Sequence, residues 1–153
     1  MTKLGQKRTS KKKPLNKKSK RSIPSLKDKV WVVFSKYIRR RDCLATTGSI
    51  EYGECISCGT NKPFSELDAG HFVPKHNGNL FSEHGVNAQC QSCNRYHSGM
   101  PLEYQDALIE KYGIEETKRL RDENKVIKKF TVSELEELYE RYSKLLKELE
   151  SKK

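Results

Sequence analysis

The chain has 153 residues, of which 34% are hydrophobic and 33% are charged, and its formal net charge is +11. This length holds one domain with tails, and the small apolar fraction predicts a small core, which a structural metal commonly reinforces. The composition argues against a membrane protein, because no apolar run approaches the length of a bilayer span. We also expect no secretory signal, because no apolar segment follows the basic N-terminus.

The positive charge is concentrated in two segments. Residues 1–22 contain ten Lys or Arg and no acidic residue, and residues 27–41 contain six basic residues and one acidic residue. Segments of this kind most often bind nucleic-acid phosphates through counterion release, although a solubilising tail and an anionic-membrane patch are alternatives. With almost nothing to bury, residues 1–24 are predicted to form a basic disordered tail.

The first predicted helix covers about residues 26–41, with Ser25 as its N-cap. Its apolar face combines Val30, Trp31, Val33, Phe34, Tyr37 and Ile38. Basic side chains fill the other face, which could lie along DNA or be solvated. The candidate DNA contacts of this segment are Lys36, Arg39, Arg40 and Arg41. An irregular, glycine-containing loop is expected over residues 42–54.

Four cysteines frame the middle of the chain in two Cys-x2-Cys pairs, Cys55 with Cys58 and Cys90 with Cys93. Two such pairs can close a tetrahedral zinc site, which is structural because four thiolates leave no open position. A spacer of 31 residues separates the pairs, more than the roughly 15–20 of a zinc ribbon, so a hairpin with a catalytic group fits between them. Cysteines in metal spacing favour a reducing cytoplasm over a disulfide framework.

The segment between the pairs is predicted to form a strand over residues 64–74 and a loop with a short second strand over 75–86, followed by a helix from Cys90 to about His97. His71 lies on this hairpin. A lone histidine is usually a core or surface residue, but a neutral imidazole near pH 7 also suits the removal of a proton from water. A divalent ion would stabilise the charge that develops on a phosphate, so the frame indicates a metal-dependent nuclease.

Three further helices are predicted, over residues 101–112, 114–123 and 131–151. The last begins with a capping box, formed by Thr131 and Glu134. Its apolar stripe fits packing on its own domain, with a short dimeric coiled coil as the alternative.

Short motifs in the frame resemble the HNH class of His-Me-finger endonucleases, in which a β-hairpin and a helix hold one divalent metal. They are Gly70-His71-Phe72, Asn87 and Cys90-x2-Cys93-Asn94. More closely, the chain from about residue 26 to 124 resembles the NinG (Rap) recombination nucleases of lambdoid phages. The motifs that carry this resemblance are Tyr37-Ile38-Arg39-x-Arg41-Asp42, Cys55-Ile56-Ser57-Cys58-Gly59, Ala69-Gly70-His71-Phe72, Asn87-Ala88-Gln89-Cys90 and Cys93-Asn94-Arg95-x-His97-Ser98-Gly99.

The resemblance implies His71 as the general base, Asn87 as the residue that ties the hairpin loop, and Asn94 as a ligand of a catalytic divalent ion such as Mg²⁺. Many HNH enzymes carry a metal-binding Asp immediately before the base, where this chain has Gly70. The candidates to complete the metal shell are Asp68 and His97. Two basic residues that flank the site are candidates for phosphate contacts, with simple exposure as the alternative: Lys75 and Arg95.

We therefore predict an α+β fold with a small zinc-stapled ββα core of His-Me-finger type, flanked by helices. Its parts would be the tail 1–24, an HNH-like nuclease domain over 25–125 and a C-terminal amphipathic helix over 131–151. The resemblance implies a metal-dependent DNA endonuclease, selective for branched recombination intermediates such as Holliday junctions and D-loops. Hydrolysis of the phosphodiester would leave 5′-phosphate and 3′-hydroxyl ends.

The expected partners are branched or double-stranded DNA and, as a hypothesis, a second copy of the chain in a homodimer; no membrane is expected. The resemblance implies a phage protein that works in the cytoplasm of the bacterial host. Two other functions stay open. One is a restriction- or homing-type HNH nuclease, which cuts linear duplex at defined sequences. The other is a non-catalytic zinc module that binds nucleic acid.

Overall fold

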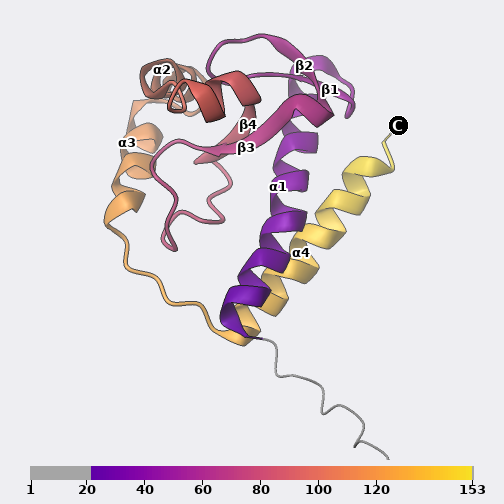
Figure 1. Cartoon of the computed structure of the whole chain (residues 1–153), viewed down its shortest axis with the longest axis vertical. Coiled ribbons are helices and arrows are strands. Elements are labelled where there is room, and N and C mark those ends of the chain that lie inside the picture. The colour runs from indigo at the N-terminus through magenta and orange to yellow at the C-terminus, as the bar shows by residue number, and fades with distance from the viewer. Residues whose placement is uncertain (1–21, 153) are drawn as a thin grey trace, which may run out of the picture.

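The computed structural model describes residues 22–152, so the predicted tail lies outside the described residues up to Arg21. Ile23 and Pro24, which the prediction assigned to that tail, are the first residues of a helix. Helices and short antiparallel strands make up a mixed α+β fold, as predicted (Figure 1). In chain order the elements are α1 (Ile23–Thr47), β1 (Tyr52–Glu54), β2 (Asn61–Pro63), η1 (Phe64–Glu66), β3 (Leu67–His71), β4 (Val86–Cys90), η2 (Ser92–Tyr96), α2 (Pro101–Tyr112), α3 (Ile114–Asp122), η3 (Glu123–Lys125) and α4 (Val132–Glu150).

Helix α1 is longer than predicted at both ends. It begins after Ser22, whose Oγ accepts a hydrogen bond from Ser25 N at 3.4 Å, so Ser22 rather than Ser25 is the N-cap. It continues to Thr47 and ends at Gly48, where a φ of 77° suits a residue without a Cβ. The loop predicted over 42–54 is therefore wrong at its start, which is helical, and at its end, which forms β1.

Tertiary contacts explain why α1 continues beyond the predicted boundary. The buried carboxylate of Asp42 accepts a hydrogen bond from Ala88 N of β4 at 2.7 Å. One residue later, Cys43 is buried in a cluster with Leu67 and Cys90. Neither contact has a signal in the local sequence, because the partners lie far along the chain.

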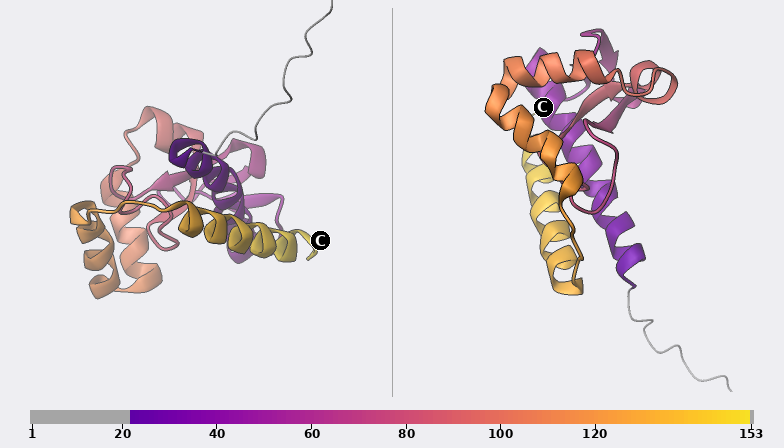
Figure 2. Two further views of the ribbon diagram at one scale, coloured as in Figure 1. Left: turned by 90° about the horizontal axis from the view of Figure 1, so that it is seen from below. Right: turned by 90° about the vertical axis from the view of Figure 1, so that its left-hand side faces the viewer.

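Helix α4 runs beside α1 in the same direction (Figure 1, Figure 2). Its capping box is confirmed: Thr131 Oγ1 accepts from Glu134 N at 3.2 Å, and Glu134 Oε2 accepts from Thr131 N at 2.9 Å. The buried side chains that join the two helices are Leu26, Val30, Phe34, Leu135 and Tyr142. Helix α4 therefore packs on its own domain, as predicted. Full burial of a Leu, Val or Phe side chain in this interface contributes about 1.5–3 kcal/mol.

Strands β3 and β4 form an antiparallel hairpin in which Gly70 pairs with Asn87. The first strand is shorter than the one predicted over 64–74, and the second strand begins only at the end of the segment 75–86. All five residues of β4 are buried, including the polar Asn87 and Gln89. These two polar residues interrupt the apolar pattern by which a buried strand is predicted, so β4 lies later in the chain than the sequence pattern indicates.

The two faces of this hairpin have different neighbours. Side-chain alternation directs Ala69 and Val86 toward α1 and α4, where they pack near Phe34 and Tyr142. The opposite face carries Asp68, Gly70, Asn87 and Gln89. The hairpin lies between the α1–α4 pair and the α2–α3 pair (Figure 1).

The segment after β4 is a π-helical turn of five residues, η2. It is shorter than the predicted helix because Cys90 belongs to the strand. The predicted α-helix of the ββα core is therefore a single turn. Left-handed backbone at Ser98, Gly99 and Met100 then leads the chain into α2. Helices α2 and α3 agree with their predictions, and none of the described helices is both long and apolar enough to cross a membrane.

Candidate functional site

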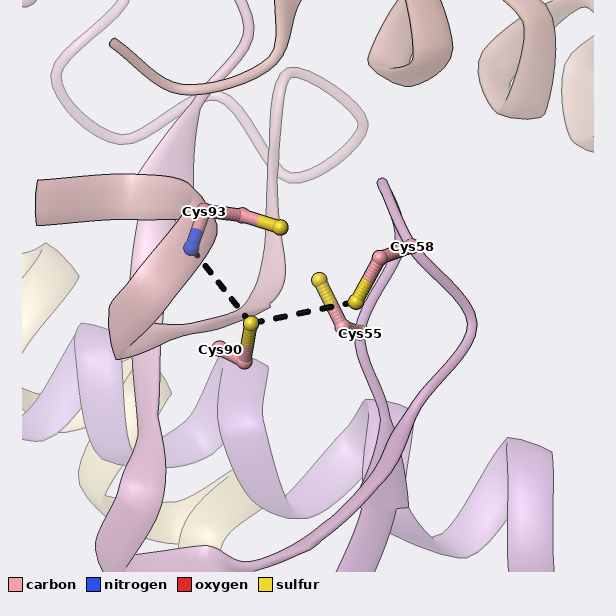
Figure 3. Close-up of side chains that lie close together, drawn as sticks. All are labelled: Cys55, Cys58, Cys90 and Cys93. Atoms are coloured by element: carbon pink, nitrogen blue, oxygen red, sulfur yellow. Dashed lines mark hydrogen bonds between the residues drawn. The ribbon is translucent and has the colours of Figure 1, made fainter. Parts of the chain in front are cut away.

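The four paired cysteines converge from separate segments (Figure 3). Cys55 and Cys58 lie in the turn between β1 and β2, Cys90 ends β4, and Cys93 lies on η2. Their Sγ atoms all lie within 4.8 Å of one another, and Cys58 Sγ is 3.9 Å from Cys90 Sγ. A tetrahedral zinc ion with bonds of about 2.3 Å would place its sulfurs about 3.8 Å apart. The cluster could therefore hold a structural metal such as zinc, as predicted.

Local hydrogen bonds shape this cysteine cluster. Gly59 N donates to Cys55 O at 2.8 Å, and Cys55 N donates to Thr60 O at 3.0 Å, which closes the first turn. Gly59 has a φ of 69°, a conformation that favours glycine. Cys93 N donates to Cys90 Sγ at 3.5 Å, and such a bond stabilises a thiolate. Four thiolates fill a tetrahedral shell, so a metal here would be structural.

Two predicted ligands of a catalytic metal, Asp68 and Asn94, are in contact. Asn94 Nδ2 donates to Asp68 Oδ2 at 3.0 Å, and Arg95 donates from two nitrogens to both Asp68 oxygens, each at 2.8 Å. Burial alone would raise the pKa of Asp68, but the hydrogen bonds from Arg95 and Asn94 outweigh burial and lower that pKa. The third predicted ligand, His97, instead lines a cavity beside Cys58, Cys90 and Cys93.

Gln89 joins Asp68 and Asn94, although the sequence motif that contains it predicts no role for it. It pairs with Asp68 across the hairpin and is fully buried. A Cβ on Gly70 would lie 2.1 Å from Gln89 Oε1 and 3.1 Å from Asn94 Oδ1, so both oxygens lie over this glycine. We call Asp68, Gln89 and Asn94 the amide–carboxylate cluster. The only sequence signal for Gln89 is that it is a polar residue directly before Cys90. This signal indicates a site residue only when β4 is known to be a buried strand.

His71 ends β3 with its imidazole held by two contacts. Its Nε2 is 3.2 Å from Leu80 O, and its ring stacks on Trp31 with centroids 5.3 Å apart. Because a carbonyl only accepts, Nε2 carries the hydrogen and Nδ1 is left as the proton acceptor. Burial, with smaller contributions from the charges of Lys75 and His76, lowers the pKa of His71 to about 4. The imidazole is therefore neutral at pH 7, and strand alternation directs it away from the amide–carboxylate cluster.

Asn87 lies in a buried network behind the hairpin. Its Nδ2 donates to His84 O at 2.9 Å and to Tyr104 Oη at 3.2 Å, which connects β4 to the loop before it and to α2. Its Oδ1 accepts from Arg41 and from Lys111, both at 3.2 Å. The Tyr104 hydroxyl donates in turn to the carbonyl of residue 70 at 2.7 Å, so the network reaches the residue that precedes His71.

The basic residues of α1 that were predicted to contact DNA have partners within the chain. Lys36 Nζ lies 3.0 Å from Glu150 of α4, and Arg40 Nη1 donates to Ile50 O at 2.6 Å. Arg39 donates to the carbonyls of residues 35 and 67, and Arg41 pairs with Asp42 at 2.7 Å. The contacts of Lys36 with Glu150 and of Arg39 with Leu67 O depend on how α4 and the hairpin pack on α1, so the sequence could not reveal them.

Lys75 differs from these residues because it is exposed and lies 5.8 Å from the centre of the Trp31 ring. It borders a cavity of about 280 Å³ that adjoins the His71 segment. The residues lining this cavity are Lys27, Asp28, Trp31, Lys75, His76, Asn77 and Leu80. Arg95 is also exposed, but its charge is paired with Asp68.

Comparisons with known proteins identify a family that matches nearly the whole chain and a relative that matches part of it. The family model described as "Bacteriophage Lambda NinG protein" matches residues 2–152. "Protein ninG" of Salmonella phage P22 is 32% identical over 100 residues, which are 62% of this chain and 47% of that protein. The chain thus spans about half the length of this curated relative. No solved structure matches the chain.

Proposed function

Because this chain belongs to the NinG family of bacteriophage proteins, we propose that it is a structure-selective DNA endonuclease acting on branched recombination intermediates, such as Holliday junctions and D-loops. The observation that carries this proposal is the state of His71: a neutral imidazole with Nε2 bonded to Leu80 O and Nδ1 as the proton acceptor. An imidazole can take a proton from water only when it is neutral and one ring nitrogen is free to accept.

The oxygens of the amide–carboxylate cluster suit a hard divalent ion such as Mg²⁺. Asn94 would hold the ion, with its amide oriented by Asp68, and the buried Gln89 oxygen without a hydrogen-bond donor supports an oxygen-liganded cation there. When bound, such an ion would polarise the scissile phosphate and stabilise the leaving oxygen. Zinc in the cysteine cluster would hold β1, β4 and η2 together and take no part in the chemistry.

In the proposed reaction, His71 Nδ1 accepts a proton from a water molecule while the water oxygen forms a bond to phosphorus. The bond between phosphorus and O3′ breaks, and O3′ takes up a proton from solvent, which leaves 5′-phosphate and 3′-hydroxyl ends. Trp31 and Leu80 keep the imidazole in position from the ring face and from Nε2. Asn87 and Tyr104 act as positioning residues, because they hold the strand that ends in His71.

Binding to DNA would rest mainly on charge. Residues 1–22 carry ten basic residues and no acid, and Lys75 adds an exposed charge near His71. Contacts of this kind are made to phosphates and carry no sequence information. Selectivity for branches would then come from DNA shape and from paired active sites in a homodimer, in the cytoplasm of the phage's host.

Cleavage of labelled DNA tests the proposal directly. Holliday junction, D-loop and linear duplex are incubated with the wild type, His71→Ala and the control His84→Ala, each with Mg²⁺ or EDTA. His84 is a suitable control because its ring contacts Glu116 and Tyr112 at the α2–α3 side. We expect cuts in the branched substrates alone, lost with EDTA and with His71→Ala. Sequence-specific cuts in linear duplex would instead indicate a restriction- or homing-type nuclease.

A second candidate function is a zinc module that binds DNA without cleaving it. It is favoured by the alternation of β3, which directs His71 and Asp68 to opposite faces, and by the pairing of Asp68 with Arg95. This function predicts binding of branched DNA that is indifferent to Mg²⁺ and to His71→Ala. Retained binding without any cleavage would establish it in place of the nuclease.

A further inference from the structure

Hydrogen bonds donated by its nitrogen fix the orientation of the Gln89 side-chain amide. Nε2 donates to Gly99 O at 2.6 Å and to Ser57 Oγ at 2.8 Å. Because a backbone carbonyl can only accept, the nitrogen must face Gly99 and the oxygen must face the other way. Gln89 is fully buried, so water does not compete for this orientation.

The oxygen end of the same amide lacks a donor. Gln89 Oε1 has no hydrogen-bond partner within residues 22–152. It lies over Gly70, and Asn94 Oδ1 lies over the same glycine, 3.1 Å from the position of its absent Cβ. Asn94 is oriented in turn by Asp68, whose Oδ2 accepts a hydrogen bond from Asn94 Nδ2. Two amide oxygens therefore lie over the same glycine, and a buried acceptor without a donor costs free energy.

A hard divalent cation is the ligand whose chemistry suits this arrangement, because Mg²⁺ and Mn²⁺ prefer oxygen donors. We infer that Gln89 Oε1 and Asn94 Oδ1 together bind the divalent cation of this site, with Gln89 supplying the ligand that Gly70 cannot. The inference rests on the proposed function for the role of the ion in the reaction. The position of the site depends only on the contacts of these amides.

Asp68 takes a different part in this site from the direct ligand that was predicted. Both of its oxygens already accept hydrogen bonds from Arg95, and its Oδ2 also holds Asn94. The direct ligands are then two neutral amides, which attract a cation less strongly than carboxylates do. We expect weak binding by the protein alone, with water and phosphate oxygens completing the shell of the ion.

A titration of the zinc-loaded full chain with Mn²⁺ tests this inference without any cleavage. The EPR signal of the free ion measures how much Mn²⁺ is bound. Gln89→Met removes the oxygen at similar side-chain volume and should weaken binding by roughly tenfold or more. Gln91→Met is the matched control, because that amide donates only to Ser65 O at 3.3 Å on the surface, and its affinity should not change. Wild-type Mn²⁺ affinity in folded Gln89→Met would overturn the inference.

The wild-type chain provides a second readout if Gln89→Met does not fold. In a Mg²⁺ titration followed by NMR, the side-chain amide signals of Gln89 and Asn94 should shift saturably, and by more than those of Gln91 and Gln105. Unmoved Gln89 signals would overturn the inference. Cleavage of branched DNA is scored separately: cleavage with an unmoved Gln89 defeats the inference alone, whereas Mg²⁺ binding at Gln89 without cleavage defeats the proposed function alone.

Discussion

Gln89 Oε1 occupies the space where a side chain of Gly70 would begin, 2.1 Å from the position of its Cβ. The two residues are diagonal neighbours in the hairpin, because Gly70 pairs with Asn87 and Asp68 pairs with Gln89. The backbone of Gly70 is not left-handed, so conformational freedom does not explain the glycine. An amide from the partner strand therefore fills the space that a side chain at position 70 would need.

Gly70→Ala is expected to displace the Gln89 side chain. The added methyl group would overlap Oε1, and overpacking of this kind costs about 1–3 kcal/mol. Urea denaturation should show the lower free energy of unfolding, and Mn²⁺ titration should show weaker binding. Gly48→Ala is the control: a φ of 77° makes it destabilising as well, but no atom lies within 4 Å of its added Cβ, and Mn²⁺ affinity should stay unchanged.

Loss of the zinc ligands is expected to unfold the centre of the domain. Cys55→Ser removes one of four thiolates that draw together β1, β4 and η2, so both metal content and thermal stability should fall. Cys43→Ala is the control, since Cys43 is buried in the same core but is not one of the four clustered sulfurs. It should lose some stability and keep its metal. Unchanged zinc content and melting in Cys55→Ser would contradict a structural zinc site.

The low pKa of His71 predicts a specific dependence of stability on pH. This pKa is about 4 in the folded chain against 6.5 ordinarily, mainly because the ring is buried. Between these values the unfolded chain binds a proton that the folded chain does not. The free energy of unfolding should therefore fall as the pH drops from about 6.5 to 4, by at most about 3 kcal/mol. Urea titrations of the wild type and His71→Ala across this range measure the difference.

The same shift predicts that the acidic limb of cleavage lies below the ordinary histidine range. Lys75→Gln removes a positive charge that lowers the pKa of His71, so its acidic limb should move to higher pH. The pH profile of kcat/KM for a branched substrate checks both statements. A limb at 6.5 that does not respond to Lys75→Gln would contradict the assignment of His71 as the base.

Tyr104→Phe is expected to weaken the support of the strand that ends in His71. The hydroxyl donates to Gly70 O and accepts from Asn87, and the residue is buried, so its loss should cost about 1–3 kcal/mol. Cleavage should show a lower kcat with little change in DNA affinity. Tyr52→Phe is the comparison, because Tyr52 is exposed on β1, and this surface change should stay within about 0.5 kcal/mol of the wild type.

Lys75 and Lys36 should differ in their effect on DNA binding. Lys75 is exposed beside the His71 segment, so Lys75→Ala should reduce affinity and lower the salt slope of binding by about one. Lys36 is paired with Glu150 at 3.0 Å, so Lys36→Ala should leave the slope nearly unchanged. Fluorescence anisotropy at several salt concentrations measures both. Equal salt slopes for Lys75→Ala and Lys36→Ala would show that the DNA does not contact Lys75.

The sequence by itself determined those features that depend on neighbours along the chain. Pro101 and Gly113 bound α2, and the capping box of Thr131 and Glu134 opens α4, because caps and turns are closed by hydrogen bonds over three or four residues. The two Cys-x2-Cys pairs likewise carry their own turns. For these features, residue type and spacing are nearly the whole physical cause.

The tertiary structure decided where distant segments meet. Strand β4 has two buried polar residues, and it exists because Asn87 and Gln89 find partners on α1, α2 and the cysteine turn. Arg41, predicted to face DNA, is instead held by Asp42 and the hairpin loop. The contact of Gln89 with Gly70 follows from strand register alone. Buried polar groups must be satisfied by whatever the fold brings to them, and no local pattern of residues records that partner.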